Sequence, residues 1–201
     1  MMGRARRNEN MGIMRIKMTY LAVGLVLALL VGLSSSRHNN PADILYWSSK
    51  HPLTWEDFQG IPQYQYEDIS AITSSGIVHY KGCKDGLINY KVRAYFEKQH
   101  SWVKEEALTD HHLEHEQIHF DITELYARKL RKALSERAFA CGEEEAFEIY
   151  VSAYLDNWET EQRAYDIFTH HSIERGRQKE WFYKIALELD LLKDFADPEM
   201  E

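Results

Sequence analysis

The chain has 201 residues, and its 32 aspartates and glutamates outnumber its 24 lysines and arginines to give a formal net charge of −8. This length is sufficient for one domain with a substantial hydrophobic core. The acidic balance argues against a nucleic-acid partner, because binding to the phosphate backbone requires clustered lysine and arginine.

The N-terminal segment has the layout of a secretory signal. An apolar run over residues 21–33 is followed by Ser34, Ser35 and Ser36, and it is preceded by basic residues at Arg4, Arg6, Arg7, Arg15 and Lys17. We therefore predict that residues 1–36 are a signal peptide or an N-terminal membrane anchor. Both remain open, since residues 18–33 approach the roughly 20 apolar residues of a membrane span and no tight A-x-A cleavage site is present. In either case we expect the domain outside the cytoplasm: periplasmic, at the cell surface or secreted.

The chain has two cysteines, Cys83 and Cys141. In an oxidising compartment they can form a disulfide. Two free thiols are the alternative, since the sequence gives no geometry. Neither cysteine belongs to a Cys-x-x-Cys pair, which argues against a thiolate metal site.

Two segments have the pattern of β-strands. Residues 71–80 are rich in Ile, Val, Thr and Ser, and residues 88–96 alternate between apolar and polar side chains, as in a half-buried strand. The Lys81-Gly82 and Asp85-Gly86 steps predict turns. We expect the two strands to form a small antiparallel sheet.

Helical periodicity predicts three helices after the sheet. Thr109 or Asp110 is a suitable N-cap for the first helix, which continues to about residue 137. The second begins within residues 143–145 and continues to about residue 175, with Gly176 as its C-terminal stop. The third carries its apolar residues on one face and ends before Pro198.

These elements predict the domain organisation. Residues 37–46 are expected to be a linker and residues 47–197 the folded domain. A small antiparallel sheet followed by three helices is an α+β fold.

The most informative motif is His-Glu-Gln-Ile-His at residues 115–119, an H-E-x-x-H sequence. Residues four apart lie one above the other on a helix, so His115 and His119 can bind the same ion. Glu116 points to the side, where it can accept a proton from metal-bound water. Zinc lowers the pKa of such water to about 7. The motif therefore predicts Zn²⁺ as the cofactor and Glu116 as the general base.

A helix with solvent-exposed histidine and glutamate gives the same motif by chance. Two observations favour a site. His115 and His119 continue the apolar face formed by residues such as Ile122 and Leu130, so they point toward the core, where imidazoles need polar partners. The motif also follows a β segment in a chain with an export signal.

A catalytic zinc site usually has three protein ligands and one open position. The core stripe of the second helix becomes polar at Gln162, Asp166 and Thr169, and such a change often marks a site. Asp166 is the leading candidate for the third ligand, because it is a carboxylate on the inner face. The alternatives are His171, Glu159 and Glu161.

Other histidines and acids near the motif have less defined roles. His171 is alternatively a donor that stabilises a developing oxyanion. His111 and His112, one turn before the motif, are either additional ligands or supporting and surface histidines. Asp121 and Glu124 fall largely on another face of the helix, and we expect them to be solvated.

Four segments in the same order resemble the bacterial domain-of-unknown-function family 922. They are Leu53–Gly60, Ala71–Gly76, His115–Ile122 and Tyr165–His171, and the resemblance spans about residues 47–192. It implies a zincin-like fold and zinc-dependent protease activity. Its Tyr-Asp-x-x-Thr-x-His pattern points to Asp166, Thr169 and His171. The family pattern usually continues from His to Gly, whereas this chain has Ser172 after His171.

The sequence thus predicts an extracytoplasmic zinc metallopeptidase-like hydrolase. Zinc would be bound by His115, His119 and Asp166, with Glu116 and His171 as catalytic residues and His171 or Tyr165 as oxyanion donors. A peptide or protein substrate would add as an extended strand to a sheet edge.

The alternative from another class is a non-catalytic zinc-binding or envelope-associated protein with the same fold. Its zinc site would be closed by a fourth protein ligand, His112 or His171. A hydrolase of cell-wall or other non-protein amides is a third hypothesis.

Overall fold

The structure, a computed structural model, describes residues 43–199. These residues belong to the larger of two compact units, which comprises residues 40–201. The signal or anchor predicted at residues 1–36 lies outside the described part of the chain. Within residues 43–199, no helix combines the length and the apolar character needed to cross a membrane.

The main sheet is antiparallel and has three strands in the order β1-β4-β3. Strand β3 (Ser75–Lys84) and strand β4 (Leu87–Glu97) form a long hairpin, and β1 (Ile44–Tyr46) pairs with the end of β4. Residues 44–46 were predicted to be part of the linker, so the folded unit starts earlier than expected. The short β1 strand is recognisable only through its pairing with β4.

The hairpin confirms one predicted turn and excludes the other. Asp85 and Gly86 have φ values of 54° and 79°, which an Asp-Gly step adopts readily. The turn predicted at Lys81-Gly82 is wrong, because Gly82 continues β3 opposite Asn89.

The predicted strand over residues 71–80 is divided between two sheets. Strand β2 (Ala71–Ile72) pairs with β5 (Trp102–Val103), and the chain then joins the main sheet at Ser75. Thr73 and Ser74 between them bond elsewhere: Thr73 Oγ1 donates to the carbonyl oxygen of Glu116 at 3.2 Å, and Ser74 N–H donates to Ser101 Oγ at 2.9 Å. This break brings the segment against the H-E-x-x-H motif.

Three helices follow the strands, as predicted: α2 (Asp110–Ser135), α3 (Glu144–Thr169) and α4 (Arg175–Leu191). Short 3₁₀ turns lie at Trp55–Asp57, Glu105–Ala107 and Lys193–Phe195. Thr109 is the N-cap of α2, and its side chain accepts from His112 N–H, which confirms the expected start.

The predicted end of the second helix at Gly176 is wrong. Helix α3 ends at Thr169, and His170, His171 and Ser172 have φ values of 45°, 51° and 74°. These left-handed conformations stop the helix. Gly176 instead lies in the first turn of α4.

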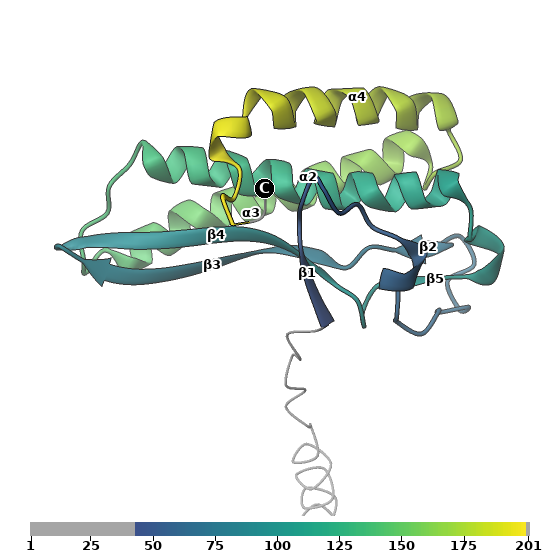
Figure 1. The fold of residues 1–201 in the computed structure, drawn as a ribbon, viewed down its shortest axis with the longest axis horizontal. Coiled ribbons are helices and arrows are strands. Elements are labelled where there is room, and N and C mark those ends of the chain that lie inside the picture. Colours follow the sequence, from purple (N-terminus) through teal and green to yellow (C-terminus); the bar gives the residue numbers. More distant parts are fainter. Residues whose placement is uncertain (1–42, 200–201) are drawn as a thin grey trace, which may run out of the picture. The chain divides into compact units, whose positions relative to one another are not determined.

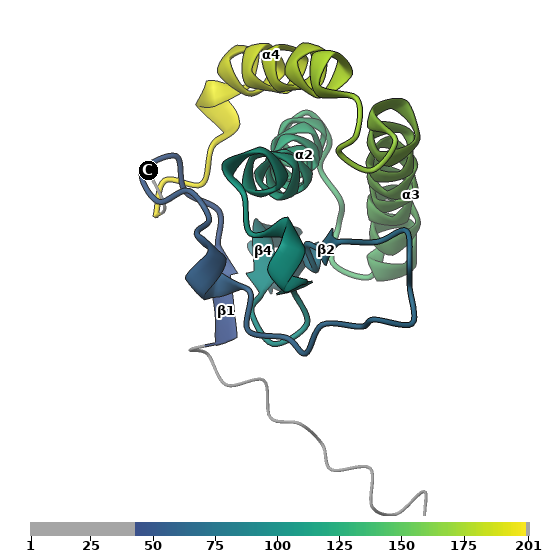
Figure 2. The ribbon, with the colours of Figure 1, turned by 90° about the vertical axis from the view of Figure 1, so that its right-hand side faces the viewer.

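Helix α2 is the central element of the fold. It packs against β3 and β4 on one side and against α3 and α4 on the others (Figure 1). Figure 2 shows it end-on, surrounded by β4, α3 and α4. Alternate residues of β4, among them Val92, Ala94 and Phe96, are buried on the helical side, together with the inner face of α2. The apolar residues of the alternating pattern in residues 88–96 therefore form the core face of the sheet.

Two acidic residues of α2 that were expected to be solvated are not: Glu124 is buried and Asp121 is half-buried. Glu124 is 2% exposed, and its Oε1 accepts from Arg128 Nε at 2.9 Å and from Arg131 Nη1 at 3.0 Å. Asp121 Oδ1 accepts from Trp47 Nε1 and Gln117 Nε2, both at 2.8 Å. Helix α4 and Trp47, which follows β1, cover this side of α2, which the helical periodicity alone did not reveal.

Cys83 and Cys141 form a disulfide, which settles the question that the sequence left open. The bond joins the end of β3 to the loop before α3, so it links the sheet to the helices across 58 positions of sequence.

We predict that removing this disulfide destabilises the domain substantially. In the chain-entropy model a closed loop of this length contributes about 4 kcal/mol. Urea denaturation of the Cys83→Ser/Cys141→Ser double variant should show a lower midpoint than the wild type, and a steeper slope because the unfolded chain without the bond is less compact. An equal midpoint for the two proteins would contradict the prediction.

Candidate metal centre

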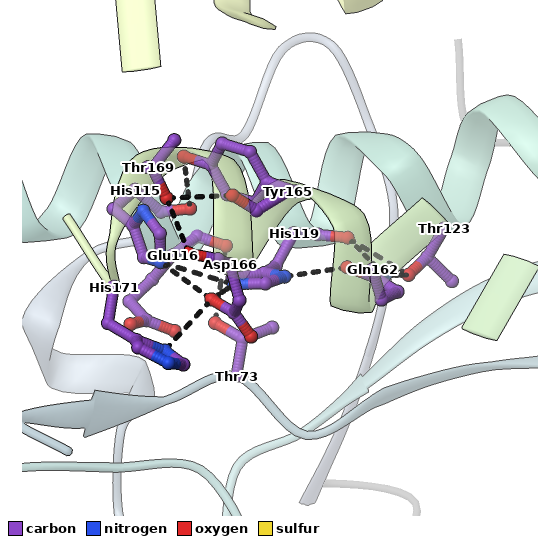
Figure 3. Close-up of polar contacts among 10 residues, drawn as sticks. All are labelled: Thr73, His115, Glu116, His119, Thr123, Gln162, Tyr165, Asp166, Thr169 and His171. Atoms are coloured by element: carbon purple, nitrogen blue, oxygen red, sulfur yellow. Dashed lines mark hydrogen bonds and ion pairs between the residues drawn. The ribbon is translucent and has the colours of Figure 1, made fainter. Parts of the chain in front are cut away.

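Three side chains from two helices converge on one point. His115 Nε2 and His119 Nε2, one turn apart on α2, lie 3.2 Å from each other. Asp166 Oδ1 on α3 lies 3.2 Å from the first nitrogen and 3.0 Å from the second (Figure 3). Among the described residues these three form a group of side chains whose geometry can hold a metal ion.

The spacing of the three atoms fits a tetrahedral ion. Ligands of tetrahedral zinc at 2.0–2.2 Å from the ion lie about 3.4 Å from one another. The observed separations of 3.0–3.2 Å are within a few tenths of an ångström of this value. Two imidazoles and one carboxylate are also a donor set typical of zinc.

Burial and charge act in opposite directions on this cluster. Burial lowers the pKa of His115 to about 4. Burial also opposes protonation of His119, but the hydrogen bond and charge of Asp166, together with Glu116, outweigh it and raise the pKa of His119 to about 9. The same pairing outweighs desolvation at Asp166 and lowers the pKa of its carboxyl group. The fold therefore stabilises one positive charge, the proton on His119, next to the Asp166 carboxylate. A metal cation can supply this charge in place of the proton.

Glu116 lies beside the cluster and is 4% exposed. Burial raises the pKa of its carboxyl group, although Thr73 and the charge of His119 act in the opposite direction. Within residues 43–199, Glu116 Oε2 has no hydrogen-bond partner. A buried carboxylate with an unpaired oxygen beside a cation site can accept a proton.

A cavity of about 390 Å³ opens onto the cluster. One wall is the segment 69–75 around β2, and the opposite wall belongs to α3, including Trp158, Gln162 and Arg163. His115, Glu116, His119 and Asp166 all line this cavity. The cluster is therefore accessible to a small molecule or an extended chain.

The alternatives for the third ligand are placed differently from Asp166. His171 Nδ1 lies 3.5 Å from Asp166 Oδ1, and its side chain is 54% exposed, so it stands beside the cluster at the cavity wall. Glu159 also lines the cavity but pairs with Arg163. Glu161 bonds to Lys184 of α4 at 2.5 Å, on the side of α3 that faces α4.

His111 and His112 form hydrogen bonds outside the cluster. His111 Nε2 lies 2.5 Å from the carbonyl oxygen of Ser172, and this carbonyl can only accept, so the nitrogen carries a hydrogen. His112 lines the cavity, with its Nδ1 2.8 Å from Thr109 Oγ1. His111 thus supports the loop after α3.

Tyr165 is fully buried between α2 and α3. Its ring stacks on His115 with centroids 4.6 Å apart, and its hydroxyl donates to the carbonyl oxygen of His115 at 3.5 Å. Burial and nearby carboxylates raise its pKa. The hydroxyl therefore faces the interior, which does not fit the predicted role of Tyr165 as an oxyanion donor.

Two residues of the site were not assigned a role from the sequence. Thr73 contacts Glu116 from the break between β2 and β3, and Gln162 Oε1 lies 2.6 Å from His119 Nδ1. Gln162 stood out only as the first polar residue of the α3 stripe, and Thr73 only as part of a resembling segment. Their contacts arise from tertiary packing.

Ser172 stands where the resemblance described above leads us to expect glycine. Its φ of 74° is a conformation that glycine adopts without strain. Its carbonyl oxygen accepts from His111, so the turn is held by a bond to α2. This backbone conformation therefore suits glycine better than serine.

Comparison with known proteins gives one match. A family model described as "Bacterial protein of unknown function (DUF922)" matches residues 88–172, which include all of β4 but its first residue, helices α2 and α3, and the first three residues after α3. The match confirms the resemblance over this part of the chain, and its description names no activity. No curated protein and no solved structure matches the chain.

The metal-free cluster predicts how stability depends on pH. A histidine whose pKa rises from about 6.5 in the unfolded chain to about 9 in the fold stabilises fully below pH 6.5, and this contribution is lost as the pH rises to 9. In the presence of a chelator, the free energy of unfolding should therefore fall across this window.

Asp166→Asn should remove most of this pH dependence, because the carboxylate is the main group that raises the pKa of His119. Urea denaturation at pH 6, 7.5 and 9 measures the effect, with Asp156→Asn at an exposed position of α3 as the matched control. If the free energy of unfolding of Asp166→Asn fell with rising pH as much as that of the wild type, this account would be refuted.

Proposed function

We propose that this chain is a zinc-dependent hydrolase of the metallopeptidase type with a zincin-like fold, acting outside the cytoplasm. The observation that carries the proposal is the triangle of His115, His119 and Asp166 atoms with separations of 3.0–3.2 Å, beside the buried carboxylate of Glu116.

His115, His119 and Asp166 would hold the ion through two nitrogens and one oxygen. When bound, zinc lowers the pKa of a coordinated water and polarises a carbonyl group. Three protein ligands would leave one coordination position for water or substrate, which is the arrangement of catalytic rather than structural zinc. The cavity of about 390 Å³ supports this assignment.

Glu116 would move the proton. Its unpaired Oε2 is available to accept a proton from the attacking water and to deliver it to the leaving amine. Burial raises the pKa of this carboxyl group, which makes it a stronger base than a solvated glutamate. His171, half-exposed at the cavity wall and near Asp166, would donate to the developing oxyanion.

The substrate proposed for this cavity is an extended peptide. The segment 69–75 forms one wall and contains the two-residue strand β2, so a peptide lying along it can form backbone hydrogen bonds. Arg163 and Trp158 on the opposite wall offer a charged and an aromatic group for side chains of the substrate.

The disulfide supports an extracytoplasmic location. Disulfides persist in oxidising compartments and are rare in the cytosol, and Cys83–Cys141 is such a bond. Together with the signal or anchor predicted from residues 1–36, it favours export of the domain.

The alternative is a non-catalytic zinc protein in which His171 closes the site as a fourth ligand. The 3.5 Å between His171 Nδ1 and Asp166 Oδ1 is the specific observation in its favour. X-ray absorption of the zinc-loaded protein distinguishes the two, since the catalytic site retains a coordinated water and the closed site binds a third imidazole.

Zinc binding is the first prediction. The purified domain should bind one zinc ion, and alanine at His115, His119 or Asp166 should each weaken binding by at least about 100-fold. Chelator competition measures the affinity, with His100→Ala at an exposed histidine as the control. Equal affinity in the three variants and the wild type would exclude this cluster as the zinc site.

Glu116→Gln provides the test of catalysis. The variant should fold and bind zinc like the wild type, while cleavage of a diverse peptide library falls by roughly two to four orders of magnitude. Glu159→Gln, at the cavity wall, should retain activity. Equal cleavage by wild type and Glu116→Gln would refute the hydrolase, and absence of cleavage in the zinc-loaded wild type would favour the non-catalytic protein.

A further inference from the structure

The side-chain amide of Gln162 contacts His119 at two points. Its Oε1 lies 2.6 Å from His119 Nδ1, and its Nε2 donates to the carbonyl oxygen of His119 at 2.9 Å. Both residues line the cavity, from α3 and α2 respectively. A single glutamine thus contacts both the ring and the backbone of the histidine.

These two contacts determine which nitrogen of His119 carries a hydrogen. A backbone carbonyl oxygen can only accept, so the amide atom facing it must be the nitrogen. The amide oxygen then faces Nδ1 and can also only accept, so Nδ1 must carry the hydrogen. In the neutral ring this leaves the lone pair on Nε2, the nitrogen that faces Asp166 and His115.

The amide of Gln162 is itself held in place. Its Nε2 also lies 3.0 Å from Thr123 Oγ1, and this hydroxyl accepts from Trp158 Nε1 at 3.1 Å and donates to the carbonyl oxygen of His119 at 3.0 Å. Thr123 is fully buried. Rotation of the amide would therefore place its oxygen against a carbonyl oxygen.

His111 shows the opposite arrangement in the same helix. Gln178 of α4 donates from Nε2 to the carbonyl oxygen of His111 at 3.1 Å, and the same nitrogen lies 3.3 Å from His111 Nδ1. His111 Nδ1 therefore accepts, and Nε2 donates to Ser172. This tautomer has no lone pair on Nε2 for a metal.

His115 has no equivalent support. Its Nδ1 is buried without a hydrogen-bond partner among residues 43–199, and its ring is held by stacking on Tyr165. Of the two motif histidines, only His119 has a hydrogen-bond partner at Nδ1, whereas the Nε2 atoms of both lie close to Asp166.

We propose that Gln162 is the positioning residue of this site: it locks His119 in the Nδ1–H form and directs Nε2 to the metal. The inference rests on the proposed zinc site and deepens it, because it names what sets the affinity of that site. A second residue bonded to a metal-binding histidine typically changes metal affinity by 10–100-fold.

The first experiment measures zinc affinity by chelator competition. Gln162→Leu should bind zinc about 10–100-fold more weakly than the wild type. Gln162→Glu keeps an acceptor at His119 Nδ1 and should recover at least part of this loss. Gln178→Leu, which removes a buried glutamine from the non-ligand His111, should bind zinc like the wild type. Thermal unfolding of all variants checks that each is folded.

The second experiment needs no metal. Long-range ¹H–¹⁵N spectra of the metal-free protein should show a slowly exchanging Nδ1–H of His119, assigned by its absence in His119→Ala. This signal should persist in Gln178→Leu and be lost to fast exchange in Gln162→Leu.

Wild-type zinc affinity in Gln162→Leu, or a protected Nδ1–H of His119 in that variant, would overturn the role of Gln162. Failure of the wild type to bind zinc would instead refute the metal site. The metal-free spectra would then still support or overturn the positioning of His119 by Gln162.

Discussion

The packing of α3 against α2 is the constraint on which the rest of the site depends. It buries most of the surface of His115, Glu116 and His119 and places Asp166 against both imidazoles. Burying these groups without partners would be strongly unfavourable. The carboxylate and the protonated His119 satisfy this requirement in the metal-free chain, and a bound cation would satisfy it through the same three atoms.

The position of α2 is fixed by its other contacts. Glu124 joins Arg128 and Arg131 inside the fold, and Arg131 also donates to the carbonyl oxygens of Val92 and Phe195. The sheet and the C-terminal segment are thereby bonded to the same helix. A buried network of this kind specifies one arrangement of the elements rather than adding much stability, and the disulfide between sheet and helices adds a covalent constraint. Ligand atoms that must meet within tenths of an ångström require such a rigid frame.

The two proposals describe successive layers of one site. Three side chains would hold the ion, Glu116 would move the proton, and Gln162 would determine how His119 is presented. The asymmetry between His119, whose Nδ1 is hydrogen-bonded, and His115, whose Nδ1 has no partner among residues 43–199 and whose ring stacks on Tyr165, follows from the different residues that α3 places behind each of them. The open wall around β2 gives the site its access to a substrate.

The sequence by itself determined the α+β order of elements, the core face of β4 and the pairing of His115 with His119, because each depends on local periodicity along one strand or one helix. It also indicated Asp166, through the polar break in the second helix. The tertiary structure decided what depends on packing between distant segments: the short strand β1, the division of residues 71–80 between two sheets, the early end of α3 and the burial of Glu124. It also decided the pairing of Cys83 with Cys141 and the contact of Gln162 with His119, since neither a disulfide nor a hydrogen bond across 43 positions leaves a periodic signal in the chain.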